Sequence, residues 1–132
     1  MKKILFVLFF VCAAAFAQDD PIGQQLFPPD LIMAQSQKIH LDDKQRAAIK
    51  SEVQSAQSKF IDLQWDLKEA GETMAQMLQQ TPIDEHRVLA QADTVMGLEH
   101  QIKKIQLTML IRIKNALTPE QIAQLRQLRN AH

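Results

Sequence analysis

The chain has 132 residues, which suits a single domain, and it carries 15 basic and 15 acidic side chains. This balance excludes the strong electrostatic field on which nucleic-acid-binding proteins depend, so we expect no nucleic-acid partner. Glycine and proline are scarce, at 3 and 5 residues, while Ala, Leu, Gln, Lys and Glu are frequent. That composition favours an all-α fold.

The N-terminus predicts a cleaved export signal over residues 1–17. Two lysines precede an apolar run (4–15), and small residues stand at the two positions that a signal peptidase reads, ending in Ala17. The run is short for a membrane span of ~20 residues, so we expect cleavage after Ala17 and no transmembrane segment afterwards. Cys12 lies within the signal and follows a bulky residue, which excludes lipid attachment, and the mature chain has no cysteine.

Residues 18–29 contain three of the prolines and show no apolar periodicity, so they are expected to form a flexible arm before a single domain at 30–130. Pro28-Pro29 ends this arm. Asp30 is expected to cap a short first helix that reaches about Ile39.

A second, much longer helix is predicted from Asp42 to about Gln80. Its apolar residues recur at alternating steps of four and three, which is a heptad-like seam that requires a partner helix along its whole length. The seam consists of Ile49, Val53, Ala56, Phe60, Leu63, Leu67, Ala70, Met74 and Met77.

A third helix is expected to begin at once, with Thr81 as its cap and Pro82 in its first position, and to run to about Ala116. Such a short connection folds the two long helices into an antiparallel hairpin, pairing positions whose numbers sum to about 162. The third helix carries an apolar stripe of its own, formed by Ala92, Val95, Leu98, Ile102, Ile105, Met109 and Ile113.

Some large apolar residues lie off these stripes. Leu107, Leu110 and Ile111 make the end of the third helix apolar around much of its circumference, so it needs cover on two sides. Trp65 lies off the seam of the second helix. We therefore predict that these four residues contribute to a homodimer interface or to a surface that contacts other proteins.

A motif at the C-terminal end marks a fourth helix. Thr118 and Gln121 have the spacing of a capping box, Pro119 occupies the first helical position, and Leu117 and Ile122 occupy the hydrophobic-staple positions.

A weaker copy of this motif precedes the second helix. Leu41 stands before Asp42, which replaces the capping threonine, and Gln45 holds the reciprocal place. The predicted register places Gln45 level with about residue 117, so the two caps should share one end of the molecule.

Two such motifs flanking a long helical hairpin after a signal peptide resemble the periplasmic Spy/CpxP and heavy-metal-resistance family, whose motif is written LTxxQ. The resemblance covers roughly residues 28–130, and the stretch LIRIKNALTPEQIAQLRQLR is its most specific part. It implies a hooked four-helix hairpin that dimerises. It also implies a role as an ATP-independent chaperone for unfolded envelope proteins, as the inhibitor of a membrane signalling partner in envelope stress, or as a metal sensor.

A metal role would require converging ligands. The family's sensors use clustered histidines near the first helix, where this chain has only His40. The best remaining group is His100 with Glu99, Asp62 and Asp66 on the facing helix. These residues are the candidates for a divalent ion such as Zn, Ni, Co or Cu, and solvated side chains are the alternative reading.

No enzyme is expected, because the chain lacks a phosphate loop, a nucleophilic cysteine in the mature part and the zinc-protease HExxH pattern. Two functions remain open, both of which act by binding. One is a heavy-metal sensor, resistance or envelope-stress protein, and the other is a chaperone that works without metal.

Overall fold

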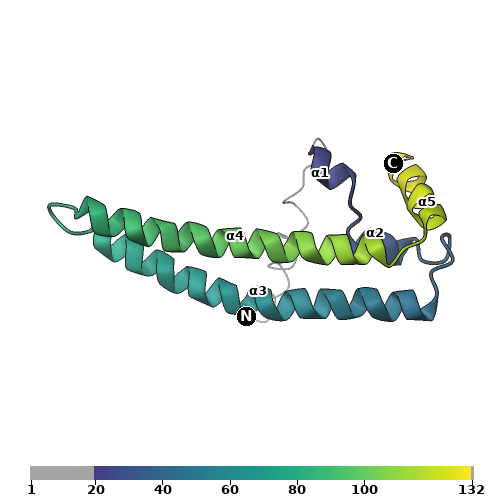
Figure 1. The fold of residues 1–132 in the computed structure, drawn as a ribbon, viewed down its shortest axis with the longest axis horizontal. Helices are drawn as coiled ribbons and strands as arrows, with labels where there is room; N and C mark the ends of the chain where they lie inside the picture. The colour runs from purple at the N-terminus through teal and green to yellow at the C-terminus, as the bar shows by residue number, and fades with distance from the viewer. Residues whose placement is uncertain (1–19, 132) are drawn as a thin grey trace, which may run out of the picture. The chain divides into compact units, whose positions relative to one another are not determined.

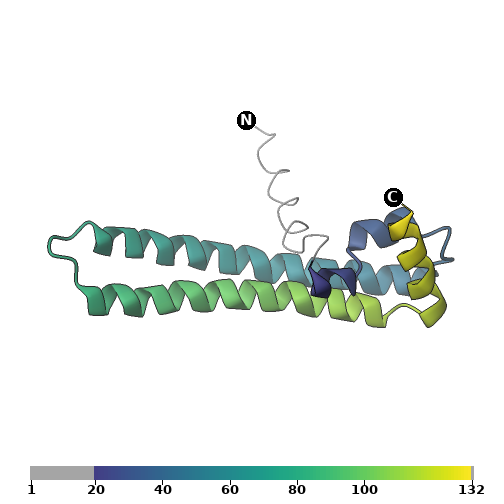
Figure 2. The same ribbon diagram turned by 90° about the horizontal axis from the view of Figure 1, so that it is seen from above.

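The structure is a computed structural model that describes residues 20–131. The helices in that range are α1 (Pro21–Gln24), α2 (Pro29–Ala34), α3 (Asp43–Leu78), α4 (Glu85–Asn115) and α5 (Pro119–Asn130) (Figure 1). Helices α3 and α4 lie side by side and antiparallel in both ribbon views (Figures 1 and 2). The all-α helical hairpin is thus confirmed, while the predicted export signal lies outside the described residues.

The chain divides into two compact units, each containing a part of α3 and α4. The first, here called the core unit, comprises the chain up to Val53 together with the chain from Thr108 onward. The second, here called the hairpin unit, comprises Gln54–Leu107. The candidate sites are described for each unit separately.

Helix α3 begins as its sequence predicts. The Asp42 carboxylate accepts a hydrogen bond from the Gln45 backbone N–H at 2.7 Å, and the Asp42 N–H donates to Gln45 Oε1 at 3.1 Å. This reciprocal pair is a complete capping box and satisfies two backbone donors that have no partner within the helix. Every residue of the predicted seam is buried or half-buried, which confirms the heptad reading of α3.

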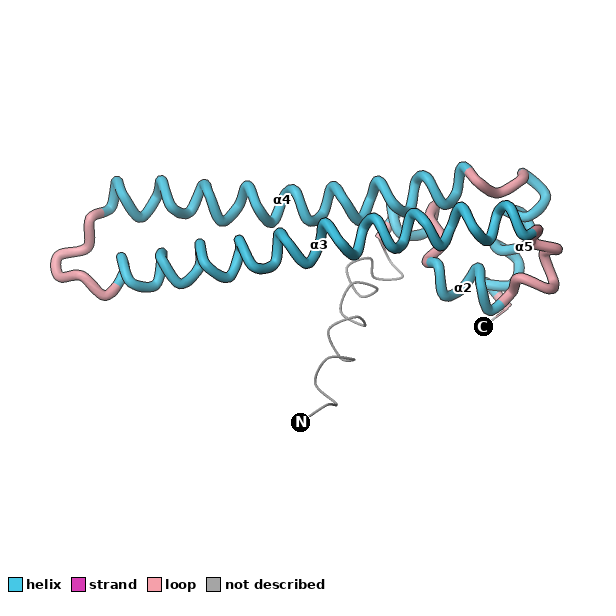
Figure 3. The backbone as a smooth tube through the Cα atoms, turned by 90° about the horizontal axis from the view of Figure 1, so that it is seen from below, coloured by secondary structure: helices cyan, strands magenta, loops and turns pink. Residues whose placement is uncertain are grey.

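Helix α4 starts later than predicted, so the assignment of Thr81 as its cap was wrong. Residues 79–84 form a loop between the helices (Figure 3), and α4 begins at Glu85. Asp84 is the cap, because its carboxylate accepts from the Arg87 N–H at 3.2 Å. An aspartate is a stronger N-cap than a threonine. Asp84 also lies closer than Thr81 to Val88, the first buried residue of α4. The helix therefore begins after Asp84 and not after Thr81.

The predicted stripe and register of α4 are confirmed. All of its stripe residues are buried or half-buried. In the hairpin unit, Gln91 Nε2 donates to the Ala70 carbonyl at 2.8 Å, one residue from the expected pairing. In the core unit, the Arg112 guanidinium lies 3.6 Å from the Glu52 carboxylate, again close to that register.

The first predicted helix is shorter than expected. Helix α2 ends at Ala34, and the chain then turns through residues 35–40. His40 has a φ of 53°, and the Leu41 N–H donates to the Ser36 carbonyl at 2.9 Å. Histidine tolerates this left-handed conformation better than β-branched residues do. The turn allows Ile39 and Leu41 both to be buried.

The structure also differs from the prediction that residues 18–29 form a flexible arm. Residues 20–29 belong to the packed core unit, with a one-turn helix, α1, whose cap is the Asp20 carboxylate. Leu26 is 8% exposed and Phe27 is fully buried. Residues 20–29 are therefore part of the folded core unit, and residues 18 and 19 of the predicted arm lie outside the described residues.

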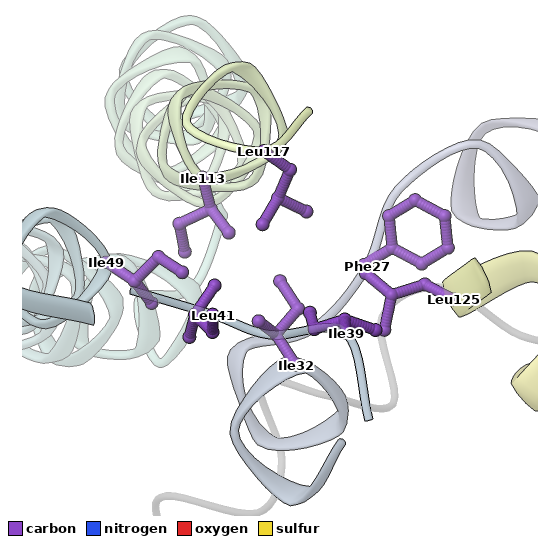
Figure 4. Close-up of a cluster of buried hydrophobic side chains, with 8 residues drawn as sticks. All are labelled: Phe27, Ile32, Ile39, Leu41, Ile49, Ile113, Leu117 and Leu125. Carbon is purple, nitrogen blue, oxygen red and sulfur yellow. The ribbon is translucent and has the colours of Figure 1, made fainter. Parts of the chain in front are cut away.

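The core of this unit is one cluster of apolar side chains drawn from α2, α3, α4 and α5 and from the segments next to them (Figure 4). Ile113 points from α4 toward Ile49 of α3, and Phe27 lies beside Leu125 of α5. The cluster consists of Phe27, Ile32, Ile39, Leu41, Ile49, Ile113, Leu117 and Leu125. It fixes the short segments against the ends of the long helices.

Two helical glycines lead to a stability prediction. A Cβ atom added at Gly71 in α3 or Gly97 in α4 would meet nothing within 4 Å. Glycine in a helix interior costs roughly 0.5–1 kcal/mol relative to alanine, so Gly71→Ala and Gly97→Ala should each stabilise the protein by that amount. Thermal unfolding followed by circular dichroism would show the gain. A loss of stability in either variant would mean that a partner approaches the helix backbone there.

Candidate functional site

The two glutamines of the capping motifs meet in the core unit. Gln45 Nε2 lies 2.7 Å from Gln121 Oε1, and Gln121 Nε2 lies 3.0 Å from Gln45 Oε1. The two amides therefore form a reciprocal pair, which is the geometry of a base-pair-like amide dimer. This pairing confirms that both motifs share one end of the molecule.

Each amide of the pair also completes its hydrogen bonds with the backbone. Gln121 Oε1 accepts from the Thr118 N–H at 2.9 Å, and its Nε2 donates to the Ile39 carbonyl at 3.1 Å. Gln45 Nε2 donates to the Ala116 carbonyl at 2.9 Å. Both side chains thus use both donors and both acceptor positions. The pair joins the starts of α3 and α5 and the end of α4, so its role is structural.

The second capping box is complete as well. The Gln121 N–H donates to Thr118 Oγ1 at 3.2 Å, and Pro119 occupies the start of α5. Leu117 is buried in the core cluster, and Ile122 packs against the same cluster. The predicted capping and staple positions of the C-terminal motif are confirmed.

The N-terminal segment, residues 20–27, is held by three cationic side chains. Arg129 of α5 donates to the carbonyls of Gln24, at 3.0 Å, and of Leu26. Lys114 Nζ donates to the Gln25 carbonyl at 2.7 Å, and Arg126 contacts the Gln25 side chain at 3.4 Å. The carbonyls at the end of α1 and just after it have no partners within a continuing helix, so they can accept hydrogen bonds from these cations.

An aromatic contact reinforces this arrangement. The Arg129 guanidinium lies 4.4 Å from the centre of the Phe27 ring, and Lys114 Nζ lies 6.0 Å from it. Burial lowers the pKa of Arg129, and the charge of Arg126 lowers it further. Sequence analysis missed the roles of these residues: Lys114, Arg126 and Arg129 lie in the stretch that carries the family resemblance, but none occupies a capping or staple position. The one sequence feature that could have indicated these contacts is the pair Arg126 and Arg129, which lie one turn apart beside the apolar face of α5.

The hairpin unit exposes several large apolar side chains. Trp65 is 66% exposed, and Ile61, one turn away on α3, is 54% exposed. Leu89 and Met96, two turns apart on α4, are 57% and 55% exposed. Charged groups accompany them, because Lys68 Nζ lies 5.6 Å from the centre of the Trp65 ring. Exposed apolar groups beside charges are typical of binding surfaces.

The predicted surface at the end of α4 is only partly available. Leu110 is 8% exposed and is therefore buried within the chain, so its assignment to an outer surface was wrong. Leu107 is half-buried, and Ile111 remains 44% exposed. Packing within the core unit buries part of the apolar surface of α4 that had suggested a second subunit.

The metal candidates do not form a cluster in one chain. His40 lies on the exposed turn before α3, while His100, Glu99, Asp62 and Asp66 are exposed in the hairpin unit. Within residues 20–131, no group of three or more His, Cys, Asp or Glu side chains could hold a metal ion. The candidate ligands, all of which lie in the described part of the chain, thus do not by themselves fit a metal centre.

Comparison with known proteins establishes the class of the protein. The model of the heavy-metal resistance family matches residues 3–124, which is most of the chain. The chain belongs to this family, which indicates a role in heavy-metal resistance or sensing. No curated protein and no solved structure matches it significantly. None of the helices described in residues 20–131 has the length and hydropathy needed to cross a bilayer.

Proposed function

We propose that this protein is an exported, periplasmic and non-enzymatic member of the Spy/CpxP type that acts during metal or envelope stress by binding unfolded or misassembled proteins. Family membership supports the stress role. The observation that carries the mode of action is the exposure of Ile61, Trp65, Leu89 and Met96 in the hairpin unit. Neighbouring exposed apolar side chains with charged groups beside them suit weak, transient contacts with clients of varied sequence.

Trp65 provides the test, because it is the only tryptophan in the chain and is exposed. We expect Trp65→Ala in the mature protein to lower suppression of the aggregation of reduced α-lactalbumin severalfold. Its free energy of unfolding should change by no more than about 0.5 kcal/mol, as for other surface substitutions. Client binding should also blue-shift the Trp65 fluorescence and protect the indole from acrylamide quenching.

The matched control is Gln54→Ala, which changes an exposed polar residue on the same helix. This variant should keep full aggregation suppression. If wild-type protein fails to suppress aggregation, or if Trp65→Ala suppresses it equally well, the proposed client surface is wrong.

Metal sensing is the second candidate function, favoured by the family to which the chain belongs. Because the ligand candidates of one chain do not converge, a sensing site would have to be completed by a second subunit or by residues outside 20–131. Isothermal titration of the mature protein with Zn, Ni, Co and Cu tests this function. Stoichiometric binding that is lost in His100→Ala would favour the sensor over the chaperone.

We also propose a homodimer, with Ile111 and Leu107 as candidate contacts, because both retain exposed apolar surface on α4. Sedimentation velocity at micromolar concentration would detect it. A monomer at all concentrations would exclude the dimer without affecting the client surface.

A further inference from the structure

Residues 20–27 contact the rest of the core unit in the way that a bound peptide contacts its receptor. Their backbone hydrogen bonds are local, from Gln24 to Asp20, from Gln25 to Ile22 and from Leu26 to Gly23, at 3.1–3.3 Å. Side chains of α4 and α5 then bind the outward carbonyls, and Phe27 is buried as an anchor. An aromatic anchor combined with main-chain capture is a general mode of peptide recognition.

The segment is also attached in a way that allows it to leave. Pro28 is exposed and extended, with a ψ of 148°, and it stands between Phe27 and the first residue of α2. The N–H groups of Leu31 and Ile32 donate to the Pro28 carbonyl. The first hydrogen bonds of α2 therefore do not involve residues 20–27, so these residues can leave the surface of α4 and α5 without unwinding this helix.

The side chains that bind residues 20–27 are expected to bind unfolded chains in preference to folded ones. Lys114 and Arg129 bind backbone carbonyls, and no ion pair within residues 20–131 involves either side chain. Backbone carbonyls occur in every sequence; in folded proteins most buried ones already have partners, whereas unfolded segments offer many free ones. The aromatic position adds selectivity, since the Arg129 guanidinium stacks on the ring of Phe27.

We propose that the surface of α4 and α5 beneath residues 20–27 is a second peptide-binding site, which the N-terminal segment occupies as an internal ligand. Its external ligand is an unfolded client segment in which an aromatic residue follows several free backbone carbonyls. This assignment rests on the proposed function, and it names the class of client segment. The N-terminal segment then acts as a competitor that keeps Phe27 in the site until a client displaces it.

The test uses the full mature chain carrying Phe27→Ala, and the probe is a fluorescent peptide with the sequence of residues 20–29, DPIGQQLFPP. Fluorescence anisotropy should show binding to this variant and at least about tenfold weaker binding to wild type, where the site is filled. A probe with alanine in place of its phenylalanine should also bind about tenfold more weakly.

Two further variants identify the receptor side of the site. Adding Arg129→Ala to Phe27→Ala should abolish binding of the probe. Adding Arg46→Ala, which changes an exposed arginine near the start of α3, should leave binding intact. Failure of the probe to bind folded Phe27→Ala protein, or equal binding after Arg129→Ala, overturns the proposal.

A measurement on wild type covers the case in which Phe27→Ala does not fold. Excess probe should accelerate amide hydrogen exchange in residues 24–27 and leave the exchange of α3 unchanged. Unchanged exchange in both regions overturns the proposal. Reduced, carboxymethylated α-lactalbumin, which is permanently unfolded, should produce the same acceleration, and its failure to do so overturns the client assignment.

The outcomes separate this site from the proposed function. Probe binding needs no client, so a positive result together with no suppression of aggregation would retain the site and reject the chaperone role. Suppression of aggregation without any probe binding would reject the second site and retain the chaperone role. A wild-type dimer that dissociates when the probe is added would identify the segment of a second copy as the occupant, and it would overturn the client assignment.

Discussion

Ile113→Ala is expected to destabilise the protein by about 2–5 kcal/mol, the usual range for truncating a large buried aliphatic side chain. Ile113 is fully buried where segments of α2, α3, α4 and α5 converge. These neighbours are fixed by caps and by the hairpin register, so they cannot collapse into the space that the side chain leaves. The cost should therefore include a cavity contribution as well as lost burial.

The matched control for this prediction is Ile111→Ala, two residues away on the same helix. Ile111 is 44% exposed, and alanine has the higher helix propensity, so its removal should change stability by no more than about 0.5 kcal/mol. Urea unfolding followed by circular dichroism measures both variants. Equal losses would contradict the packing described here, and a loss at Ile111 that grows with protein concentration would indicate that a second subunit covers it.

Gln121→Ala is expected to cost about 2–4 kcal/mol, although the side chain makes no ionic contact. The Gln121 side chain is 6% exposed, and its loss leaves the Thr118 N–H, the Ile39 carbonyl and the Gln45 amide without their partner. Desolvated polar groups that lose a hydrogen bond cost more than the bond contributed. Gln124→Ala, on the exposed side of the same helix, is the control and should be nearly neutral.

A double-mutant cycle tests whether the two glutamines act as a unit. The combined Gln45→Ala and Gln121→Ala variant should lose less stability than the two single losses added together, with a coupling of about 0.5–3 kcal/mol. Strict additivity in chemical unfolding would show that the amide pair contributes no mutual stabilisation. Gln121→Glu keeps the shape of the side chain but cannot donate to the Ile39 carbonyl, so it should also destabilise.

The candidate binding surfaces were only partly predictable. Trp65 was recognised because it lies off the seam, and its exposure agrees with a surface role. Leu110 was misplaced by the same reasoning, since periodicity identifies the face that packs on the partner helix but not the short segments that cover other faces. The metal candidates were chosen from an approximate register, and the structure shows no cluster of ligands among the described residues.

Local chemistry was sufficient for the hairpin itself. The steps of three and four residues fixed which faces of α3 and α4 meet, and the Asp42 and Thr118 motifs fixed where α3 and α5 begin, because caps act within one turn. The pairing of Gln45 with residues near 117 followed from these features and from a short connection. The sequence alone thus determined the helices, their facing stripes and the end at which both caps lie.

Tertiary packing decided the rest. Whether residues 20–27 form a loose arm or a bound segment depends on Arg129 and Lys114, which are about 90 or more positions away in sequence and carry no local pattern that points to Phe27. The mutual pairing of two glutamines likewise exists only after the hairpin closes. Contacts between side chains distant in sequence depend on three-dimensional proximity, which no local periodicity encodes, and here they hold the N-terminal segment over the proposed second site.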